Sequence, residues 1–184
     1  GGAPAPGGRA RAAPGLGSGA GGFQQRLASC GSLDAVLGAL REAPASWSPI
    51  SLATAWHRLA KHSRRGGPGR RDEVGQAVRQ LSRAQAEVSP GRFRPRALVN
   101  IVYAWALLRV RQETLWTPVC ARLAGAAGSC NAQEVANLLY ALALVRAEGP
   151  GEADLLRAAR EAVPRRAAEL SPQEASNTLY ALAL

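Results

Sequence analysis

The chain has 184 residues, enough for one ordinary domain or a short run of repeats; 47% of them are hydrophobic and only 5% are aromatic. Its formal net charge of +10 favours a polyanionic partner, because arginine contacts to phosphate release counterions. Lys61 is the only lysine, so nearly all of the positive charge is arginine, a bias that GC-rich coding also produces without selection for binding. Charge alone therefore leaves the partner open.

Composition argues against two classes of protein. Cys30, Cys120 and Cys130 form no CxxC pair and are odd in number, which disfavours a disulfide framework and fits a reducing compartment. The longest apolar stretch, residues 97–110, is shorter than the roughly 20 residues that a membrane-spanning helix needs. We expect neither a disulfide-rich secreted domain nor a membrane protein or membrane partner.

The first 22 residues differ in composition from the rest. Small residues, Pro and Arg dominate residues 1–22, and the first acidic residue of the chain is Asp34. We expect this segment to be a disordered, low-complexity stretch; its acid-poor, arginine-bearing composition is also typical of organelle transit segments. The chain contains no Met and stops inside an apolar run, so we expect a fragment of a longer protein.

Helical segments are predicted throughout residues 23–184. The first is expected at about Leu33 to Glu42. Beyond it, four segments align with one another without gaps: Pro49–Lys61, Pro95–Leu107, Ala132–Leu144 and Pro172–Leu184. Their spacing of about 40 residues is typical of an array of helical repeats.

Start signals identify these segments as helices. Pro49, Pro95 and Pro172 each stand in the first turn, where the missing N–H of proline costs nothing. Ser171 and Glu174 in addition match a capping box.

Second amphipathic stretches alternate with the four segments, at about residues 72–88, 112–127 and 152–170. Pro164 in the last stretch is expected to kink or split that helix. The order of helices predicts an all-α fold, an α-solenoid of three helix hairpins and a truncated fourth with repeats of about 40 residues.

One face of each repeated helix is apolar at i, i+3, i+4 and i+7, which is the spacing of a face buried against another helix. We expect this face to form the core. Its members are Leu52, Ala55, Trp56 and Leu59, then Leu98, Ile101, Val102 and Trp105, then Val135, Leu138, Leu139 and Leu142, and finally Ala175, Thr178, Leu179 and Leu182.

The opposite face carries a polar stripe at i, i+4 and i+7. Its members are Arg96, Asn100 and Tyr103, then Gln133, Asn137 and Tyr140, then Gln173, Asn177 and Tyr180, with Ile50, Thr54 and His57 as a degenerate first copy. Asn is a poor helix former, so its recurrence in three helices needs a reason beyond helix formation.

Two interpretations of the polar stripe are open. Stacked repeats would align amide groups that can pair with base edges and rings that can stack on bases, which suits unpaired RNA on a concave face. Alternatively, the Asn side chains bridge adjacent repeats by hydrogen bonds and the Tyr rings pack between them. Both roles want the same residue types.

Two of the repeated segments carry a family resemblance. Residues Ser171 to Ala183 and Ala132 to Ala143 closely resemble the signature PQELANTLWALA of octotricopeptide repeat proteins, which are relatives of the FAST-kinase-domain leucine-rich proteins. The resemblance covers about residues 33–184. It implies an organellar RNA-binding protein, in the mitochondrial matrix or the chloroplast stroma, that governs maturation, stability or translation of transcripts. Arrays of this family often end in a RAP domain.

The predicted function is sequence-selective binding of single-stranded organellar RNA, with other organellar RNA-processing proteins as further partners and no cofactor. The candidate RNA-binding residues are the polar stripes of the last three repeats with Thr54, His57, Arg92 and Arg94. Arg92, Arg94 and Arg96 cluster at one helix start, where backbone N–H groups also favour phosphate. Arg58, Arg109, Arg111 and the loop from Arg64 to Arg71 are candidates for a further basic rim, and a solvated loop explains the run equally well.

The sequence leaves one alternative function open and disfavours several others. A protein-interaction scaffold that binds a peptide on its concave face is the alternative, because asparagine rows also serve extended backbones. No enzymatic activity is expected, since the acidic residues are scattered over the second helices and no catalytic dyad stands out. His57 and His62 lack further ligands at metal-binding spacing. Gly15, Gly17 and Gly19 follow no strand and are expected to belong to a linker.

Overall fold

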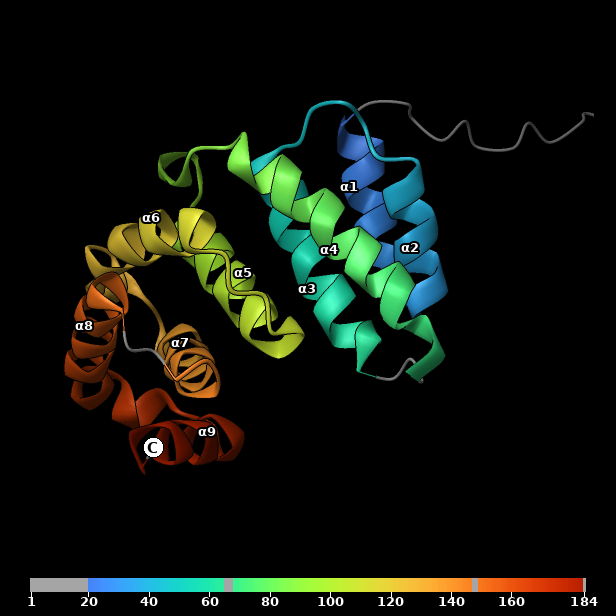
Figure 1. The fold of residues 1–184 in the computed structure, drawn as a ribbon. Coiled ribbons are helices and arrows are strands. Elements are labelled where there is room, and N and C mark those ends of the chain that lie inside the picture. The colour runs from blue at the N-terminus through green and yellow to red at the C-terminus, as the bar shows by residue number, and fades with distance from the viewer. Residues whose placement is uncertain (1–19, 65–67, 147–148, 184) are drawn as a thin grey trace, which may run out of the picture.

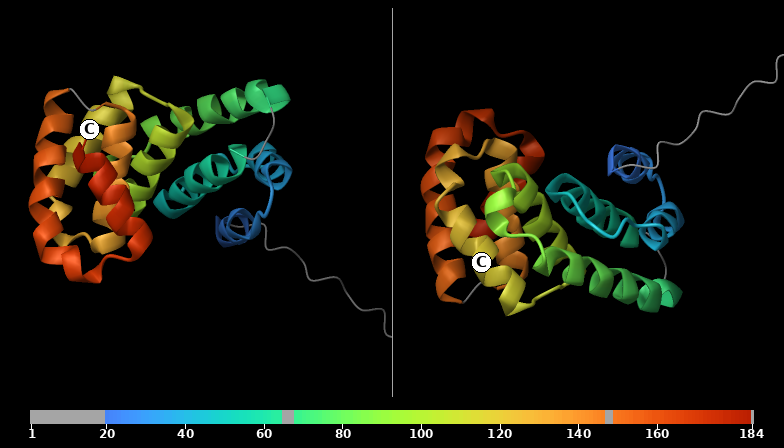
Figure 2. Two further views of the ribbon diagram at one scale, coloured as in Figure 1. Left: turned by 90° about the horizontal axis from the view of Figure 1, so that it is seen from below. Right: turned by 90° about the horizontal axis from the view of Figure 1, so that it is seen from above.

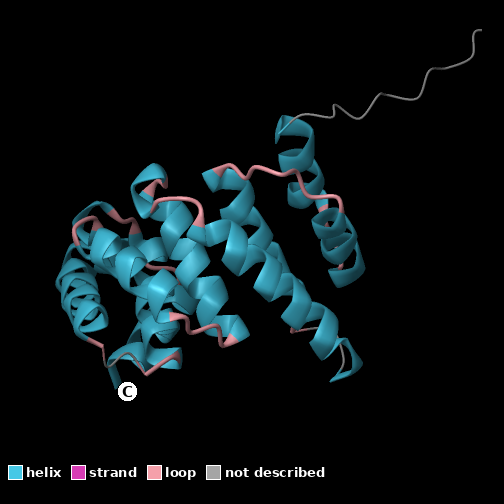
Figure 3. Ribbon diagram, turned by 45° about the horizontal axis from the view of Figure 1, so that its top comes forward, coloured by secondary structure: helices cyan, strands magenta, loops and turns pink. Residues whose placement is uncertain are grey.

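The computed structural model describes residues 20–64, 68–146 and 149–183 of the chain. The predicted low-complexity segment 1–22 lies outside these ranges except for its last three residues, which begin the first helix. Within the described ranges the chain forms helices joined by short loops and contains no strand (Figure 3). The predicted all-α class is confirmed for this part of the chain.

The helices follow one another as α1 (Ala20–Ser29), α2 (Leu33–Arg41), α3 (Pro49–Ser63), α4 (Arg71–Ala86), α5 (Pro95–Leu108), α6 (Glu113–Ala124), α7 (Ala132–Leu144), α8 (Pro150–Arg166) and α9 (Pro172–Ala183). Short 3-10 turns, η1 (Pro68–Arg70), η2 (Pro90–Arg92), η3 (Ala127–Ser129) and η4 (Ala167–Glu169), lie before α4, α5, α7 and α9. The four segments that align in the sequence are therefore α3, α5, α7 and α9.

The helices pack in two rows. The main contacts of one row join α1 to α3, α3 to α5, α5 to α7 and α7 to α9, and those of the other join α2 to α4, α4 to α6 and α6 to α8. The chain follows a curve from α1 to α9, with α6 and α8 on its outer side and α5 and α7 on its inner side (Figure 1). The views along the perpendicular direction show the same order of neighbours (Figure 2).

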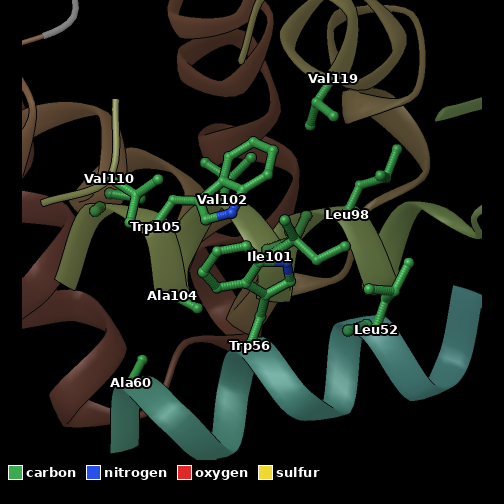
Figure 4. Packing of buried hydrophobic residues seen from close by; sticks show 14 of the residues in the cluster. Leu52, Trp56, Ala60, Leu98, Ile101, Val102, Ala104, Trp105, Val110 and Val119 are labelled. Atoms are coloured by element: carbon green, nitrogen blue, oxygen red, sulfur yellow. The ribbon is translucent and has the colours of Figure 1, made fainter. Parts of the chain in front are cut away.

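Three tryptophans form the centre of the core. The Trp56 ring of α3 meets the Trp105 ring of α5 edge to face at 5.9 Å, and Trp105 lies 5.6 Å from Trp116 of α6, measured between centroids. All three side chains are fully buried, and Figure 4 shows Trp56 below Ile101 and Trp105. Such aromatic pairs add about 0.5–1.5 kcal/mol beyond the burial of their area. The cluster therefore ties both rows together where α3, α5 and α6 meet.

The predicted core face is buried in α3, α5 and α7 and only partly so in α9. Each of the four predicted members is buried in the first three helices. In α9, Thr178 is buried but Leu179 is 69% exposed and Leu182 is 40% exposed. The prediction was wrong for these two leucines, because the described residues include no outer helix that packs on α9 as α8 packs on α7.

The cap signals are present in the structure. The Ser48 hydroxyl accepts a hydrogen bond of 3.1 Å from the backbone N–H of Ser51. The Ser171 backbone N–H donates to the Glu174 carboxylate at 2.8 Å, which closes the predicted capping box. Asn131 begins α7 with a second capping box that we did not predict. These caps satisfy N–H groups that lack partners inside the helix.

One detail of the row formed by α2, α4, α6 and α8 departs from the prediction. α8 runs through Pro164 without a break and ends two residues later, at Arg166. Pro164 is exposed, so water can satisfy the carbonyl that loses its partner, and little helix remains beyond it to disturb.

No described helix is long and apolar enough to cross a membrane.

Candidate functional site

The polar stripes lie side by side on the inner row, and their tyrosines form a ladder. The rings of Tyr103 on α5 and Tyr140 on α7 are 6.2 Å apart between centroids, and those of Tyr140 and Tyr180 on α9 are 5.9 Å apart. Each pair is tilted, by 42° and 46°. Equivalent residues of the three aligned segments α5, α7 and α9 are thus in direct register.

Burial of the ladder falls along the chain. Tyr103 and Tyr140 are half-buried between neighbouring helices, whereas Tyr180 is 51% exposed. Burial raises the pKa of the Tyr103 hydroxyl above its ordinary value, and the neighbouring Tyr140 adds to this while the Arg64 charge opposes it. The Tyr103 hydroxyl therefore stays protonated at neutral pH. None of the three tyrosine hydroxyls has a hydrogen-bond partner among the described residues.

The asparagines of α5 and α7 do not bridge neighbouring repeats. Asn100 and Asn137 are half-buried, and their side chains make no hydrogen bond within the described residues. Their amide atoms are not sealed in the interior without a partner, so both amides reach the surface. Asn177 on α9 accepts a hydrogen bond of 3.1 Å from Gln173 of its own helix. The bridging interpretation therefore has no hydrogen bond to support it.

The first copy of the stripe, on α3, is chemically different. The Thr54 hydroxyl accepts a hydrogen bond of 3.0 Å from the Gln24 side chain of α1. Burial lowers the pKa of the His57 imidazole below its ordinary value, and the charges of Arg58, Lys61 and His62 act in the same direction. His57 is therefore neutral at neutral pH and can both donate and accept a hydrogen bond.

A hollow of about 680 Å³ lies at the N-terminal side of α3 and α5. It brings together six of the predicted binding residues, namely Thr54, His57, Arg92, Arg94, Arg96 and Asn100. Apolar groups of Ile50, Ala53 and Ala97 also line it. The other seven predicted residues do not line this hollow. Two of them, Gln133 and Gln173, lie exposed in the first turns of α7 and α9.

The arginines of the predicted basic rim divide into two groups. Arg58 donates to the carbonyl oxygens of Ala28 and Cys30 at the end of α1, and Arg111 pairs with Glu113 and Glu152. These two have structural partners. Arg70 likewise pairs with Asp34 and Glu73, while residues 65–67 of the same loop lie outside the described residues.

The second group has no ion-pair partner in the described part of the chain. It consists of Arg92, Arg94, Arg96 and Arg109, all of which are exposed. Their guanidinium groups are therefore available to a ligand. The cluster at the start of α5 remains the densest positive charge beside the polar stripes.

Sequence reasoning named Arg64 and Arg109 as candidates for a basic rim but missed Lys61 and Arg146, which lie at the same ends of the inner helices. A hollow of about 580 Å³ between α3 and α5 is lined by Lys61, Arg64 and Tyr103. A second of about 620 Å³, between α5 and α7, is lined by Arg64, Arg109, Tyr140 and Arg146 among others. The signal that would have found Arg146 is positional, because it follows Asn137 at the same interval at which Arg109 follows Asn100.

The three cysteines are buried thiols outside this surface. Burial raises the pKa of Cys120 to about 12, assisted by the negative charges of Glu152 and Glu113. Burial also raises the pKa of Cys130 to about 11. Since the thiolate is the reactive form, neither is an activated nucleophile at neutral pH.

The chain is similar to a known chloroplastic protein. No protein-family model matches the chain. No solved structure matches it either. The chain is similar to a RAP domain-containing protein, chloroplastic, of Oryza sativa subsp. japonica, with 33% identity over 139 residues, which are 69% of this chain and 20% of that protein. The chain therefore spans about a fifth of the length of a chloroplastic, RAP domain-containing relative.

Proposed function

We propose that the chain binds single-stranded RNA along the polar stripes of α3, α5, α7 and α9. The observation that carries this proposal is the state of the stripe: the amides of Asn100 and Asn137 have no hydrogen-bond partner among the described residues, and they lie one turn from a ladder of tyrosines. Amides without partners can pair with the edges of unpaired bases, and aromatic rings can stack on base faces.

The proposal takes the two rows of helices to be an α-solenoid with repeats of about 40 residues. Support comes from the succession of neighbour contacts within each row and from the tyrosine register between α5, α7 and α9. In such an array each repeat presents the same positions to the ligand, so the binding surface grows by one stripe per repeat. Side chains that differ between stripes would give sequence selectivity.

The proposed site of action is an organelle, where binding would support the processing, stability or translation of transcripts. The chloroplastic relative supports this location. The RAP domain of that relative also supports the proposal. The sequence resembles the octotricopeptide family, whose arrays often end in such a domain. The proposal assigns no catalytic step to this chain, whose contribution would be binding alone.

The test is fluorescence-anisotropy titration of the chain with a labelled single-stranded RNA pool, against double-stranded RNA and dextran sulfate, over a salt series. Asn137→Ala and Tyr140→Ala are the stripe variants. Gln76→Ala, which shortens an exposed amide side chain on α4 in the outer row, is the matched control. We expect preference for single strands, with binding weakened in both stripe variants; loss of one base stack costs about 1–3 kcal/mol.

The opposite result is equally informative. If RNA and dextran sulfate bind alike, with a steep salt dependence and no effect of either stripe variant, the positive charge acts nonspecifically. The RNA proposal then fails.

A peptide-binding scaffold is the second candidate, and one observation favours it. The hollow at the N-terminal side of α3 and α5 combines apolar groups of Ile50, Ala53 and Ala97 with three arginines at the start of α5. This combination suits an acidic peptide with an apolar anchor. Binding of such a peptide that is lost in Ile50→Asp, together with RNA binding that ignores the stripe variants, would put this function first.

A further inference from the structure

The C-terminal ends of three successive inner helices carry arginines beside the polar stripes. Arg64 follows α3, Arg109 follows α5 and Arg146 lies just beyond α7. Arg109 and Arg146 hold the same position in their repeats, since each stands nine residues after its stripe asparagine, Asn100 or Asn137. All three side chains are exposed.

The backbone at two of these positions is unusual. Arg109 has φ 56° and Arg146 has φ 49°, and they are the only non-glycine residues with positive φ in the described part of the chain. A left-handed residue after a helix is commonly glycine, because a Cβ atom is unfavourable in that conformation. Arginine nevertheless occupies the position twice, at equivalent places. This recurrence favours a binding role for the two guanidinium groups over a role of the backbone alone.

The surroundings suit an anion. Arg64, Arg109 and Arg146 line one hollow of about 620 Å³ together with Tyr140. Arg64 also lines the adjoining hollow of about 580 Å³ with Lys61 and Tyr103. No acidic side chain of the described residues lines either hollow. None of the three arginines has an ion-pair partner in residues 20–64, 68–146 and 149–183.

At the N-terminal ends of the inner helices, the charge beside the polar stripes changes sign from α5 to α7 and α9. At the start of α5 it is basic, but α7 and α9 carry Glu134 and Glu174 in their first turns. Both carboxylates are held in capping boxes by the backbone N–H groups of Asn131 and Ser171, at 3.0 and 2.8 Å. Only the C-terminal edge therefore presents positive charge after α3, α5 and α7 in succession.

We propose that Arg64, Arg109 and Arg146 form a phosphate-binding row that holds the sugar–phosphate backbone of a bound single strand, while the bases face the Asn and Tyr side chains. Each repeat contributes one arginine to the row. The proposal rests on the proposed RNA binding and adds to it which edge of the stripe carries the backbone. Guanidinium groups suit this role because they can bind phosphate oxygens in a bidentate manner.

The test compares Arg109→Gly/Arg146→Gly with Arg122→Gln/Arg160→Gln. Glycine is the favoured residue in the left-handed conformation, so the first variant removes both guanidinium groups without loss of stability. The second removes the same charge from exposed, unpaired arginines of α6 and α8, in the outer row. Thermal unfolding verifies that both variants remain folded, and anisotropy titrations with the single-stranded RNA pool over a salt series measure binding.

We expect the slope of log K against log salt concentration to become shallower by about 1.4 in the glycine variant, since each phosphate contact to a single strand contributes about 0.7. The control variant should keep the slope of the parent chain. Weakened binding with intact preference for single strands would support the row.

Two results would overturn the proposal in distinguishable ways. If binding still depends on Asn137 and Tyr140 but both arginine variants have the same slope, RNA binding stands and the phosphate row is wrong. If the parent chain does not prefer single-stranded RNA over dextran sulfate, the proposed function fails and the row fails with it.

Discussion

α3 and α9 are aligned segments of the sequence, but they differ in which features they keep. α3 keeps the buried core face, and α9 keeps the Asn and Tyr of the polar stripe. The core face of α3 is fully buried, with Trp56 against Trp105, but its stripe has Thr54 and His57 where later repeats have Asn and Tyr. α9 keeps Asn177 and Tyr180, but Leu179 on its core face is 69% exposed. The two faces of one motif are therefore separable: burial depends on which helices pack around it, and the stripe depends only on its own residues.

The largest expected effect comes from the core face. Leu139 on α7 and Leu179 on α9 are equivalent in the repeat, but Leu139 is fully buried. Leu139→Ala should lower the free energy of unfolding by about 2–5 kcal/mol, because it leaves a cavity. Leu179→Ala should change it by less than about 0.5 kcal/mol. Urea denaturation followed by circular dichroism measures both, and equal losses would show that Leu179 is buried in solution.

The stripe of α3 allows a gain of function. Thr54→Asn/His57→Tyr gives α3 the stripe residues of α9, and an added stacking ring is worth about 1–3 kcal/mol per base. We expect single-stranded RNA to bind at least about fivefold more tightly. The matched change, Asn177→Thr/Tyr180→His, should weaken binding on α9. Unchanged affinity in both variants would mean that the strand does not run along the whole inner row.

The smallest effect concerns acid stability, which should distinguish α3 from the other stripes. The pKa of His57 is lowered in the folded chain from its ordinary 6.5 by burial and by neighbouring positive charges. Below 6.5 the unfolded chain therefore binds more protons than the folded chain, and the free energy of unfolding falls as the pH decreases. His57→Gln should remove this part of the pH dependence, as urea titrations at several pH values would measure. An unchanged dependence would place the effect on other groups.

Much of the fold could be predicted because the sequence repeats itself. Each aligned segment became a helix of the inner row, since apolar spacing, Pro in the first turn and cap residues act within a few residues of one another. Exposure of Leu179 and Leu182 could not be predicted from the spacing, because burial is decided by a second helix elsewhere in the chain. α1 escaped prediction because its two glycines and polar residues give a weak periodic signal.

The candidate site was predictable in its residue types and less so in its extent. Tyr103, Tyr140 and Tyr180 occupy the same position in their aligned segments, so their alignment into a ladder could be predicted from the sequence. The sequence could not show which arginines form ion pairs, because Arg111 meets Glu152 only through the packing of α6 against α8. Left-handed backbone at Arg109 and Arg146 carries no sequence signal when the residue is not glycine.

The packing of neighbours in two rows has a consequence for motion. α5 contacts α3, α6 and α7, so opening it breaks three sets of contacts, whereas α9 packs mainly on α7. Among the described contacts, local opening of α9 therefore breaks fewer sets of contacts than local opening of α5. If the proposed strand lies along the inner row, the described contacts give it a more rigid support at α5, beside the tryptophan cluster, than at Tyr180 on α9.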